Sequence, residues 1–238
     1  DAIEALPKSV VPIYWDYYSD NQKSYDTMIK IHKQFTSDVW FAGGAWSWIG
    51  MIPSNRYTLK SMIPALDACR EKKIKNVFFT MWGDNGGECS HFSQLPSLFY
   101  LAEYAKGNTD EAKIKEKFEK KFGLTFDEFM LLDMVNYVAD EEKIEKCLPH
   151  NPSKYCFYAD TFNGFTDYTV AEGANERYAD LANNLRAVAK KSRKYGYIFD
   201  LGAKLCALME VKYELGLKTR EAYQAGDREE LRRLADND

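Results

Sequence analysis

Three side chains that could hold a polyhydroxylated ligand follow one apolar segment of the chain. Trp82, Asp84 and Glu88 come after residues 77–81, whose Val-Phe-Phe-Thr-Met sequence is typical of a buried strand. Glycines lie between them, and glycine lets a backbone turn sharply or approach a ligand closely. An indole ring can cover the apolar C–H face of a sugar, while carboxylates accept hydrogen bonds from its hydroxyl groups. The stretch therefore predicts a sugar contact; the alternative is a tryptophan that packs the rim and acids that cap the next helix.

Two further segments, residues 10–18 and 38–48, end in the same residue types. Their candidate site residues are Tyr14, Trp15, Asp16, Trp46 and Trp48. Successive side chains of a strand point to opposite faces, so Tyr14 and Asp16 should point together and Trp15 away from them. By the same alternation, the two tryptophans of the second segment should share a face. Aromatic and acidic groups are thus expected at three strand ends.

The intervals between these segments have the spacing of helices. Apolar residues recur with a helical period over residues 19–35, 59–73 and 92–106. A strand followed by a helix, repeated at roughly 30–36 residues, predicts parallel strands joined by right-handed crossovers. Parallel strands place their carboxyl ends at one edge, where such proteins bind ligands. Three units cannot close a barrel, so this α/β domain, residues 1–107, is either completed from elsewhere or a small open sandwich.

The remainder of the chain, residues 108–238, predicts a helical domain. A charged helix is expected over residues 109–122, and Thr125 with Glu128 has the spacing of a capping box. The other expected features are a loop over 148–173, a long helix over 176–215 interrupted at 194–196 and stopped by Gly216, and terminal helices over 219–224 and 227–235.

The composition argues against several classes of protein. With 45% apolar residues, a packed core is expected rather than a disordered chain. A net charge of −4 without a basic stripe argues against nucleic acid as the partner, and no apolar run reaches the ~20 residues of a membrane span. Five scattered cysteines and three histidines predict reduced thiols and no zinc site. No signal peptide is visible, and we expect a cytoplasmic protein whose N-terminal segment is missing from this chain.

Taken together, the three strand ends resemble a known family. The motifs are VPIYWDYY, VWFAGGAWSWIG and FFTMWGDNGGECS, and they resemble the last three strands of the β-N-acetylhexosaminidase barrel, glycoside hydrolase family 20. The ending KYELGLKTREAYQAGDREELRRLA resembles the helical domain that one branch of the family carries after its barrel. The fold class that this resemblance implies is α/β: the last three strand–helix units of a (β/α)8 TIM barrel, followed by an all-helical C-terminal domain.

The resemblance also implies an activity for the intact protein. Family members remove terminal N-acetylglucosamine or N-acetylgalactosamine, and the sugar's own acetamido oxygen attacks the anomeric carbon, an exception to the retaining scheme with two carboxylates. Their catalytic pair is an adjacent Asp-Glu at the end of the fourth strand, which would lie upstream of this chain. The pairs Asp127-Glu128 and Asp140-Glu141 fall in the predicted helical region, where we expect solvated helix acids. The chain therefore resembles a C-terminal portion that contains no catalytic residue and should be inactive alone.

Substrate-binding roles follow for the strand ends from the same resemblance. Trp82 would form a wall of the sugar pocket, and Asp84, in W-x-D spacing, matches the acid that accepts a sugar hydroxyl. Glu88 would contact an adjacent hydroxyl or hold the loop. Of Trp46 and Trp48, one is expected to line the pocket, while the other could serve packing.

The first motif has two interpretations. In the family's Y-x-D motif, which Tyr14 and Asp16 would match, the tyrosine binds the acetamido oxygen and the aspartate a hydroxyl. If the strands are counted along the family's barrel, however, the Y-x-D motif belongs to the strand after this one. In that case Trp15 would form a wall of the pocket instead. Both interpretations place side chains of this segment at the pocket.

The expected partners are a glycan that ends in N-acetylhexosamine and the missing N-terminal barrel segment. An open sheet edge makes a homodimer a further prediction. No metal or organic cofactor is implied. The first alternative is a non-catalytic carbohydrate-binding or scaffold protein that keeps the tryptophans. The second is an unrelated α/β domain whose strand-end aromatics only pack.

Overall fold

A sheet of three parallel strands forms the N-terminal part of the molecule. The computed structural model describes residues 7, 9–137, 152–165, 167–170 and 173–236. The strands are β1 (Ile13–Trp15), β2 (Trp40–Gly44) and β3 (Val77–Thr80), and they pair in the order β1-β2-β3. Because both pairs of strands are parallel, all three carboxyl ends lie at one edge. The prediction of three parallel strands is confirmed.

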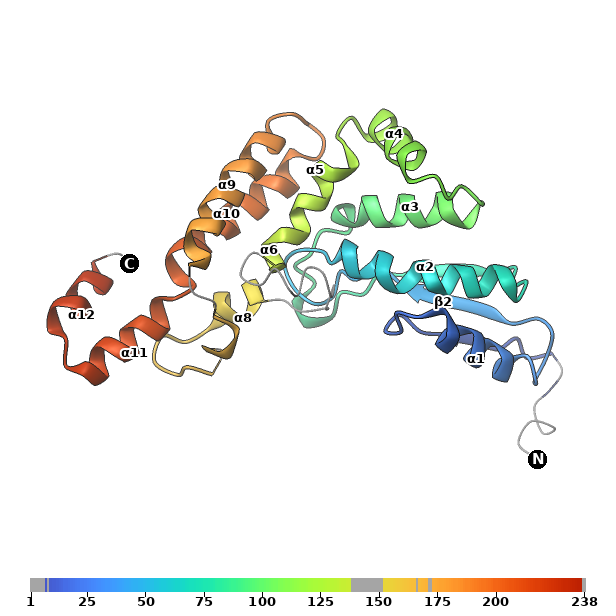
Figure 1. Cartoon of the computed structure of the whole chain (residues 1–238), viewed down its shortest axis with the longest axis horizontal. Helices are drawn as coiled ribbons and strands as arrows, with labels where there is room; N and C mark the ends of the chain where they lie inside the picture. Colours follow the sequence, from blue (N-terminus) through green and yellow to red (C-terminus); the bar gives the residue numbers. More distant parts are fainter. Residues whose placement is uncertain (1–6, 8, 138–151, 166, 171–172, 237–238) are drawn as a thin grey trace.

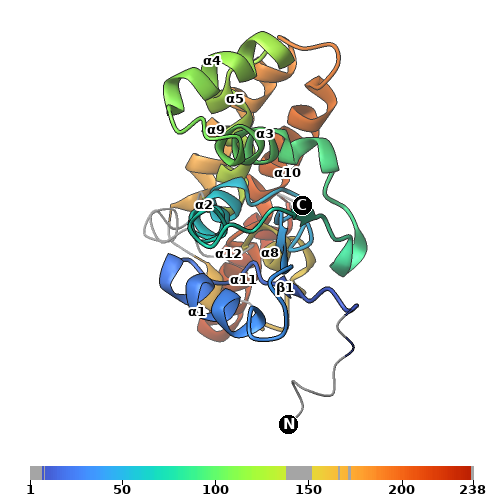
Figure 2. The ribbon, with the colours of Figure 1, turned by 90° about the vertical axis from the view of Figure 1, so that its right-hand side faces the viewer.

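Helices α1 (Gln22–His32), α2 (Asn55–Glu71) and α3 (Leu95–Ala105) contribute to a core on one face of this sheet. Figure 2 shows α1 and α2 on the same side of β1. This core consists of Tyr14, Tyr25, Ile29, Phe41, Met62, Ala65, Leu66, Ala68, Cys69 and Leu101. The crossovers therefore all return on the same side, as in a singly wound sheet, and not on alternate sides, as in a doubly wound one.

The opposite face of the sheet is largely uncovered. Ile13, Trp15 and Phe78 project from it, with 45%, 50% and 41% of their surfaces exposed. A parallel sheet is normally covered on both faces, because its strands are apolar on both. The bare face is thus an apolar surface on which another layer would fit.

The described residues after α3 are mostly helical and contribute most of the largest core cluster (Figure 1). Its helices are α4 (Glu111–Phe122), α5 (Phe126–Met130), α6 (Met134–Tyr137), α8 (Pro152–Tyr158), α9 (Ala174–Ala189), α10 (Gly196–Lys212), α11 (Leu215–Ala225) and α12 (Arg228–Ala235). Short 3₁₀ turns link several of them. In the part of the chain that the structure describes, no helix combines the length and apolarity needed to cross a membrane.

Two expectations about the helices are confirmed, and others are corrected. Thr125 and Glu128 form the capping box at the start of α5, and α4 ends at Gly123, which has a left-handed backbone. The helix expected over residues 176–215 is divided into α9 and α10, as the predicted interruption at 194–196 requires, but the break lies earlier, at residues 190–195. The loop expected over 148–173 contains helix α8 within its described residues.

Of the two glycines expected to break the long helix, Gly216 was wrongly predicted to stop it. Gly216 lies inside α11, where a Cβ atom would come within 3.4 Å of the carbonyl oxygen of Thr161. The helix that precedes it ends earlier, at Lys212. Gly196 begins α10, and a Cβ there would lie 2.4 Å from the carbonyl oxygen of Ala189. Gly216 therefore does not stop a helix, whereas Gly196 stands at the boundary between α9 and α10, as predicted.

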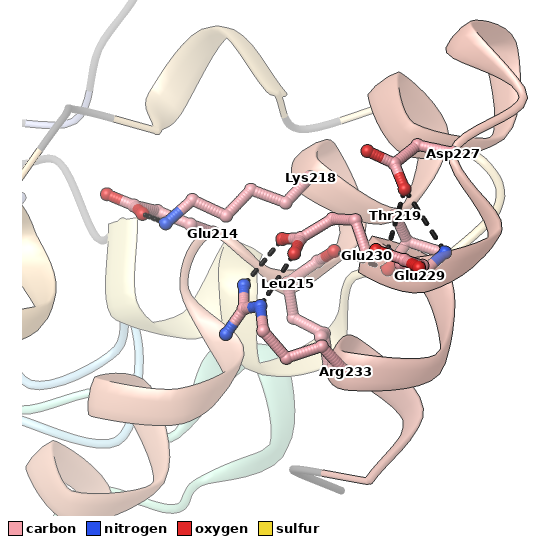
Figure 3. A network of polar contacts seen from close by, with 8 residues as sticks. All are labelled: Glu214, Leu215, Lys218, Thr219, Asp227, Glu229, Glu230 and Arg233. Atoms are coloured by element: carbon pink, nitrogen blue, oxygen red, sulfur yellow. Dashed lines mark hydrogen bonds and ion pairs between the residues drawn. The ribbon is translucent and has the colours of Figure 1, made fainter.

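The C-terminal hairpin of α11 and α12 lies at one end of the molecule (Figure 1) and is held by local polar contacts. Asp227 caps α12 by accepting hydrogen bonds from the backbone N–H groups of Glu229 and Glu230, at 3.1 and 2.9 Å. Figure 3 shows this cap beside the ion pair of Arg233 with Glu230. Such contacts satisfy the helix start without help from the core.

A buried carboxylate joins the helical part to the α/β part. Asp133 lies in the 3₁₀ turn Leu131–Asp133 and is fully buried. It accepts hydrogen bonds from the backbone N–H of Arg56 at 2.6 Å and from Nδ2 of Asn55 at 3.0 Å. Both donors are in the first turn of α2, whose own N-cap residue Ser54 makes no side-chain cap. Asp133 therefore caps α2 from the helical part.

Candidate functional site

Hydrogen bonds connect the three strand ends at the carboxyl edge of the sheet. The indole Nε1 of Trp46 donates to the carbonyl oxygen of Tyr17 at 3.0 Å, which links the ends of β2 and β1. The hydroxyl of Ser47 donates to the carbonyl oxygen of Trp82 at 3.1 Å, which links β2 to β3. The edge is thus one connected surface, as the parallel order of the strands requires.

Trp15 and Trp82 stack on each other across this edge. Their ring centroids are 5.3 Å apart and their planes differ by 20°. Trp15 is 50% and Trp82 37% exposed, so each indole keeps an outer surface in contact with solvent. At this separation no ligand fits between the rings, and a sugar would lie against their outward surfaces.

Asp84 is exposed and lies two residues after Trp82, in the 3₁₀ turn Asp84–Gly86. Burial first, and then the neighbouring charges, including that of Asp84, raise the pKa of Tyr17. Tyr17 in turn contacts Trp15 edge to face, with ring centroids 6.3 Å apart. A hydrogen-bond acceptor thus follows the exposed ring of Trp82 closely in the sequence.

Tyr14 and Asp16 lie together, as strand alternation predicts, but they bind each other. The Tyr14 hydroxyl donates to Asp16 Oδ2 at 2.7 Å, and burial, followed by this carboxylate, raises the pKa of Tyr14 well above its ordinary value. Asp16 also accepts bonds from the backbone N–H of Tyr18 at 2.8 Å and from the Ser19 hydroxyl at 2.9 Å. Trp15 points to the bare face. These bonds close the turn after β1, and a sugar contact by Tyr14 or Asp16 stays a prediction.

Trp46 and Trp48 lie beneath the edge rather than on it. Their rings are 4.5 Å apart, and the side chains are only 3% and 7% exposed. Tyr17 and Tyr57 pack edge to face against them. They support the surface from below, and a direct role of either in the pocket wall stays a prediction.

Glu88 turns back from the edge toward the helical part. Its two carboxylate oxygens each lie 3.1 Å from the ammonium nitrogen of Lys154 in α8. The hydroxyl of Tyr158 is 3.5 Å from the same carboxylate. Partial burial acts to raise the pKa of Glu88, but its own backbone N–H and Lys154 outweigh this and hold the pKa below its usual value. Of the two roles expected for Glu88, this geometry favours holding the loop.

Nothing in the sequence indicated that Lys154 and Tyr158 contact the strand edge. Both lie in a stretch whose composition predicted a loop, 66 and 70 residues from their partner Glu88. A lysine on a short helix is usually a solvated side chain. Only the folded chain shows that α8 reaches the strand edge.

The helical part matches a known protein family. The family model for the Glycoside Hydrolase 20C C-terminal domain covers residues 127–238. This part of the chain is a glycoside hydrolase 20C C-terminal domain. The resemblance to glycoside hydrolase family 20 is thereby confirmed over residues 127–238, and the match is consistent with a C-terminal portion of such a protein. A search of curated proteins found no match.

The adjacent acids Asp127 and Glu128, at the start of this domain, make ion pairs and a helix cap within the helical part. Asp127 pairs with Lys115 at 2.9 Å. Glu128 closes the capping box of α5 and also pairs with Lys191. Neither lies near the strand ends, in agreement with the expectation of helix acids. The second pair, Asp140-Glu141, lies outside the described residues.

Among the residues that the structure describes, no group of three or more His, Cys, Asp or Glu side chains is arranged to hold a metal ion. The thiols of Cys69, Cys89 and Cys206 are free and buried. Burial raises the pKa of Cys89, the thiol next to Glu88, to about 11. This cysteine is therefore a packing residue in the neighbourhood of the site.

Proposed function

We propose that this chain is the C-terminal portion of a β-N-acetylhexosaminidase, which removes terminal N-acetylglucosamine or N-acetylgalactosamine by substrate-assisted retaining hydrolysis. The chain supplies substrate-binding side chains. The catalytic Asp-Glu pair comes from strands outside this chain, which complete a (β/α)8 barrel. The match to the glycoside hydrolase 20C C-terminal domain supports the family, and the geometry of the strand edge supports the substrate.

The observation that carries the proposal is the stacked Trp15–Trp82 pair at the carboxyl edge of a parallel sheet, with the exposed Asp84 two residues after Trp82. Active sites of (β/α)8 barrels lie at this edge. The one-sided helix layer and the bare apolar face are what a segment of such a barrel would show, because in a barrel that face packs against the other strands. The same geometry would leave Ile13 and Phe78 inside a barrel core.

In the proposed mechanism, the side chains of this portion bind and orient the sugar. Trp82 and Trp15 would cover its apolar surface, and Asp84 would accept a hydroxyl hydrogen bond. Contacts of this kind accelerate the reaction when they strengthen as the sugar flattens toward an oxazolinium-like transition state. The upstream Glu would protonate the leaving oxygen, and the upstream Asp would orient the acetamido group.

The test is hydrolysis of a chromogenic N-acetyl-β-glucosaminide and the matching galactosaminide. We would assay the chain alone, mixed with the upstream segment, and as the contiguous protein. Activity in the last two samples but not in the first is the expected result. Activity of the chain alone would show that a catalytic acid is already present, and Asp84, Glu88 and Asp16 would be the first positions to mutate.

A sugar-binding protein without catalysis is the competing proposal, and the exposed tryptophan stack fits it equally well. Titration with N-acetylglucosamine, followed by tryptophan fluorescence, separates the two. Binding by the contiguous protein without hydrolysis would favour the binding protein and overturn the enzyme.

A further inference from the structure

The loop that follows β3 is built to fold back on one carboxylate. Gly86 has φ of +110° and Gly87 has φ of +66°, both in the region that favours glycine. A Cβ atom on Gly86 would lie 2.4 Å from Oε1 and 2.8 Å from Oε2 of Glu88. Any larger residue at this position would displace the Glu88 carboxylate. The backbone of the loop and the position of Glu88 are therefore coupled.

The partner of this carboxylate comes from the helical domain. The ammonium of Lys154 contacts both carboxylate oxygens at 3.1 Å, and its side chain is only 16% exposed, against 29% for Glu88. The same ammonium lies 5.8 Å from the ring centre of Tyr158, whose hydroxyl is near Glu88. Exposed ion pairs contribute little to stability, but a pair shielded from water in this way is screened less.

The loop also carries the site. Trp82 and Asp84 lie shortly before the two glycines in the same loop, and the carbonyl oxygen of Trp82 accepts a hydrogen bond from the Ser47 hydroxyl. One end of residues 82–88 is thus fixed by β2, and the other by Lys154. Between these anchors Asp84 is exposed, so its position depends on both ends.

We propose that Lys154 is a positioning residue for the sugar site: by holding Glu88 it fixes the loop on which Asp84 approaches the substrate. The inference deepens the proposed function and rests on it. It gives the helical domain a role in the site at the strand edge, in addition to packing. Lys154 acts through Glu88 and is not assigned a contact with the sugar.

The first part of the test needs no substrate. Amide hydrogen exchange of residues 83–90 would be measured in this chain for Lys154→Ala, Lys154→Arg and Gly86→Ala. Lys154→Ala and Gly86→Ala should speed exchange in this loop, while Lys154→Arg should preserve its protection, since arginine keeps the charge. Lys204→Ala is the matched control, because Lys204 forms an exposed pair with Asp200 at 2.7 Å on α10. Unchanged loop protection in Lys154→Ala would overturn the proposal.

The second part uses the contiguous protein and the chromogenic N-acetyl-β-glucosaminide. Lys154→Ala and Gly86→Ala should raise KM about fivefold with kcat nearly unchanged, because a misplaced binding group weakens ground state and transition state alike. Lys154→Arg should restore KM to within about twofold of the unaltered enzyme, and Lys204→Ala should not change it. Faster loop exchange with an unchanged KM would make Lys154 merely structural and overturn its positioning role. If the unaltered protein neither binds nor hydrolyses the sugar, the proposed function fails, while the exchange result still decides whether Lys154 holds the loop.

Discussion

Aromatic and acidic side chains at the strand ends divide into an exposed and a buried set. The alternation of a strand correctly separated Trp15 from Tyr14 and Asp16. It could not show that Asp16 is already bonded, because those bonds come from the turn that follows the strand. Nor could it distinguish Trp82, 37% exposed, from Trp46, 3% exposed, since burial of a residue beyond the strand depends on the packing of distant helices.

At the residue scale, we expect Trp82→Ala to affect substrate binding and Trp46→Ala to affect stability. Trp82→Ala should raise KM for the N-acetylglucosaminide about tenfold, equivalent to ~1.4 kcal/mol, with a small change in stability. Trp46→Ala should lower the free energy of unfolding by about 3–5 kcal/mol, because its ring is enclosed. Enzyme kinetics and urea denaturation measure the two effects. Trp82→Phe, which keeps a ring, is the control; a KM for Trp82→Ala equal to that of the unaltered enzyme would remove this tryptophan from the sugar site.

At the scale of elements, periodicity located every strand of the sheet and the helices that cover it. It failed where a helix depends on a contact far along the chain. Helix α2 begins at Asn55, earlier than its apolar pattern begins, because Asp133, 77 residues from Arg56, supplies the cap. Gly216 was misjudged as a helix stop for a similar reason: its neighbour Thr161 lies in a distant stretch of the chain and cannot be inferred from local propensity.

Asp133 also gives α2 a measurable pH dependence. Burial, opposed by the bonds from Arg56 and Asn55, raises the pKa of Asp133 from 3.8 to about 6. The folded state then binds this proton more tightly than the unfolded chain does. The stabilising contribution is therefore fully present below about pH 4 and is lost as the pH rises through about 6, a change of about 3 kcal/mol.

Asp133→Asn tests this sign. The difference in unfolding free energy between the unaltered chain and Asp133→Asn should fall by about 3 kcal/mol from pH 4 to pH 7. Urea denaturation at each pH measures the two free energies of unfolding. Subtracting the value of the variant from that of the unaltered chain removes the pH dependence that the surface carboxylates give to both. A difference that rises with pH would mean that the bonds to α2 outweigh burial.

At the scale of the whole molecule, the two parts share one core. The largest cluster combines Ile52 and Tyr100 from the α/β part with residues of α9 and α10. The family model begins at residue 127, so a boundary in sequence does not coincide with a boundary in packing. We therefore regard the helical domain as a support for the strand edge and not as a separate module.

This shared core predicts a single unfolding transition. All five tryptophans lie within the first 82 residues, whereas most helices lie beyond them, so tryptophan fluorescence and far-ultraviolet circular dichroism report on different parts. The two urea-unfolding curves should coincide for this chain. Loss of tryptophan signal at a clearly lower urea concentration would show that the parts unfold independently.

The stacked indoles of Trp15 and Trp82 also have an optical consequence. Two nearly parallel chromophores 5.3 Å apart couple their electronic transitions, so the pair should produce an exciton couplet of paired positive and negative bands. The Trp46–Trp48 pair adds a second couplet from beneath the edge. Removal of Trp82 should abolish the first contribution and leave the second. The strand edge thus contains its own spectroscopic label, and arrival of a ligand at the outer ring can be followed without a dye.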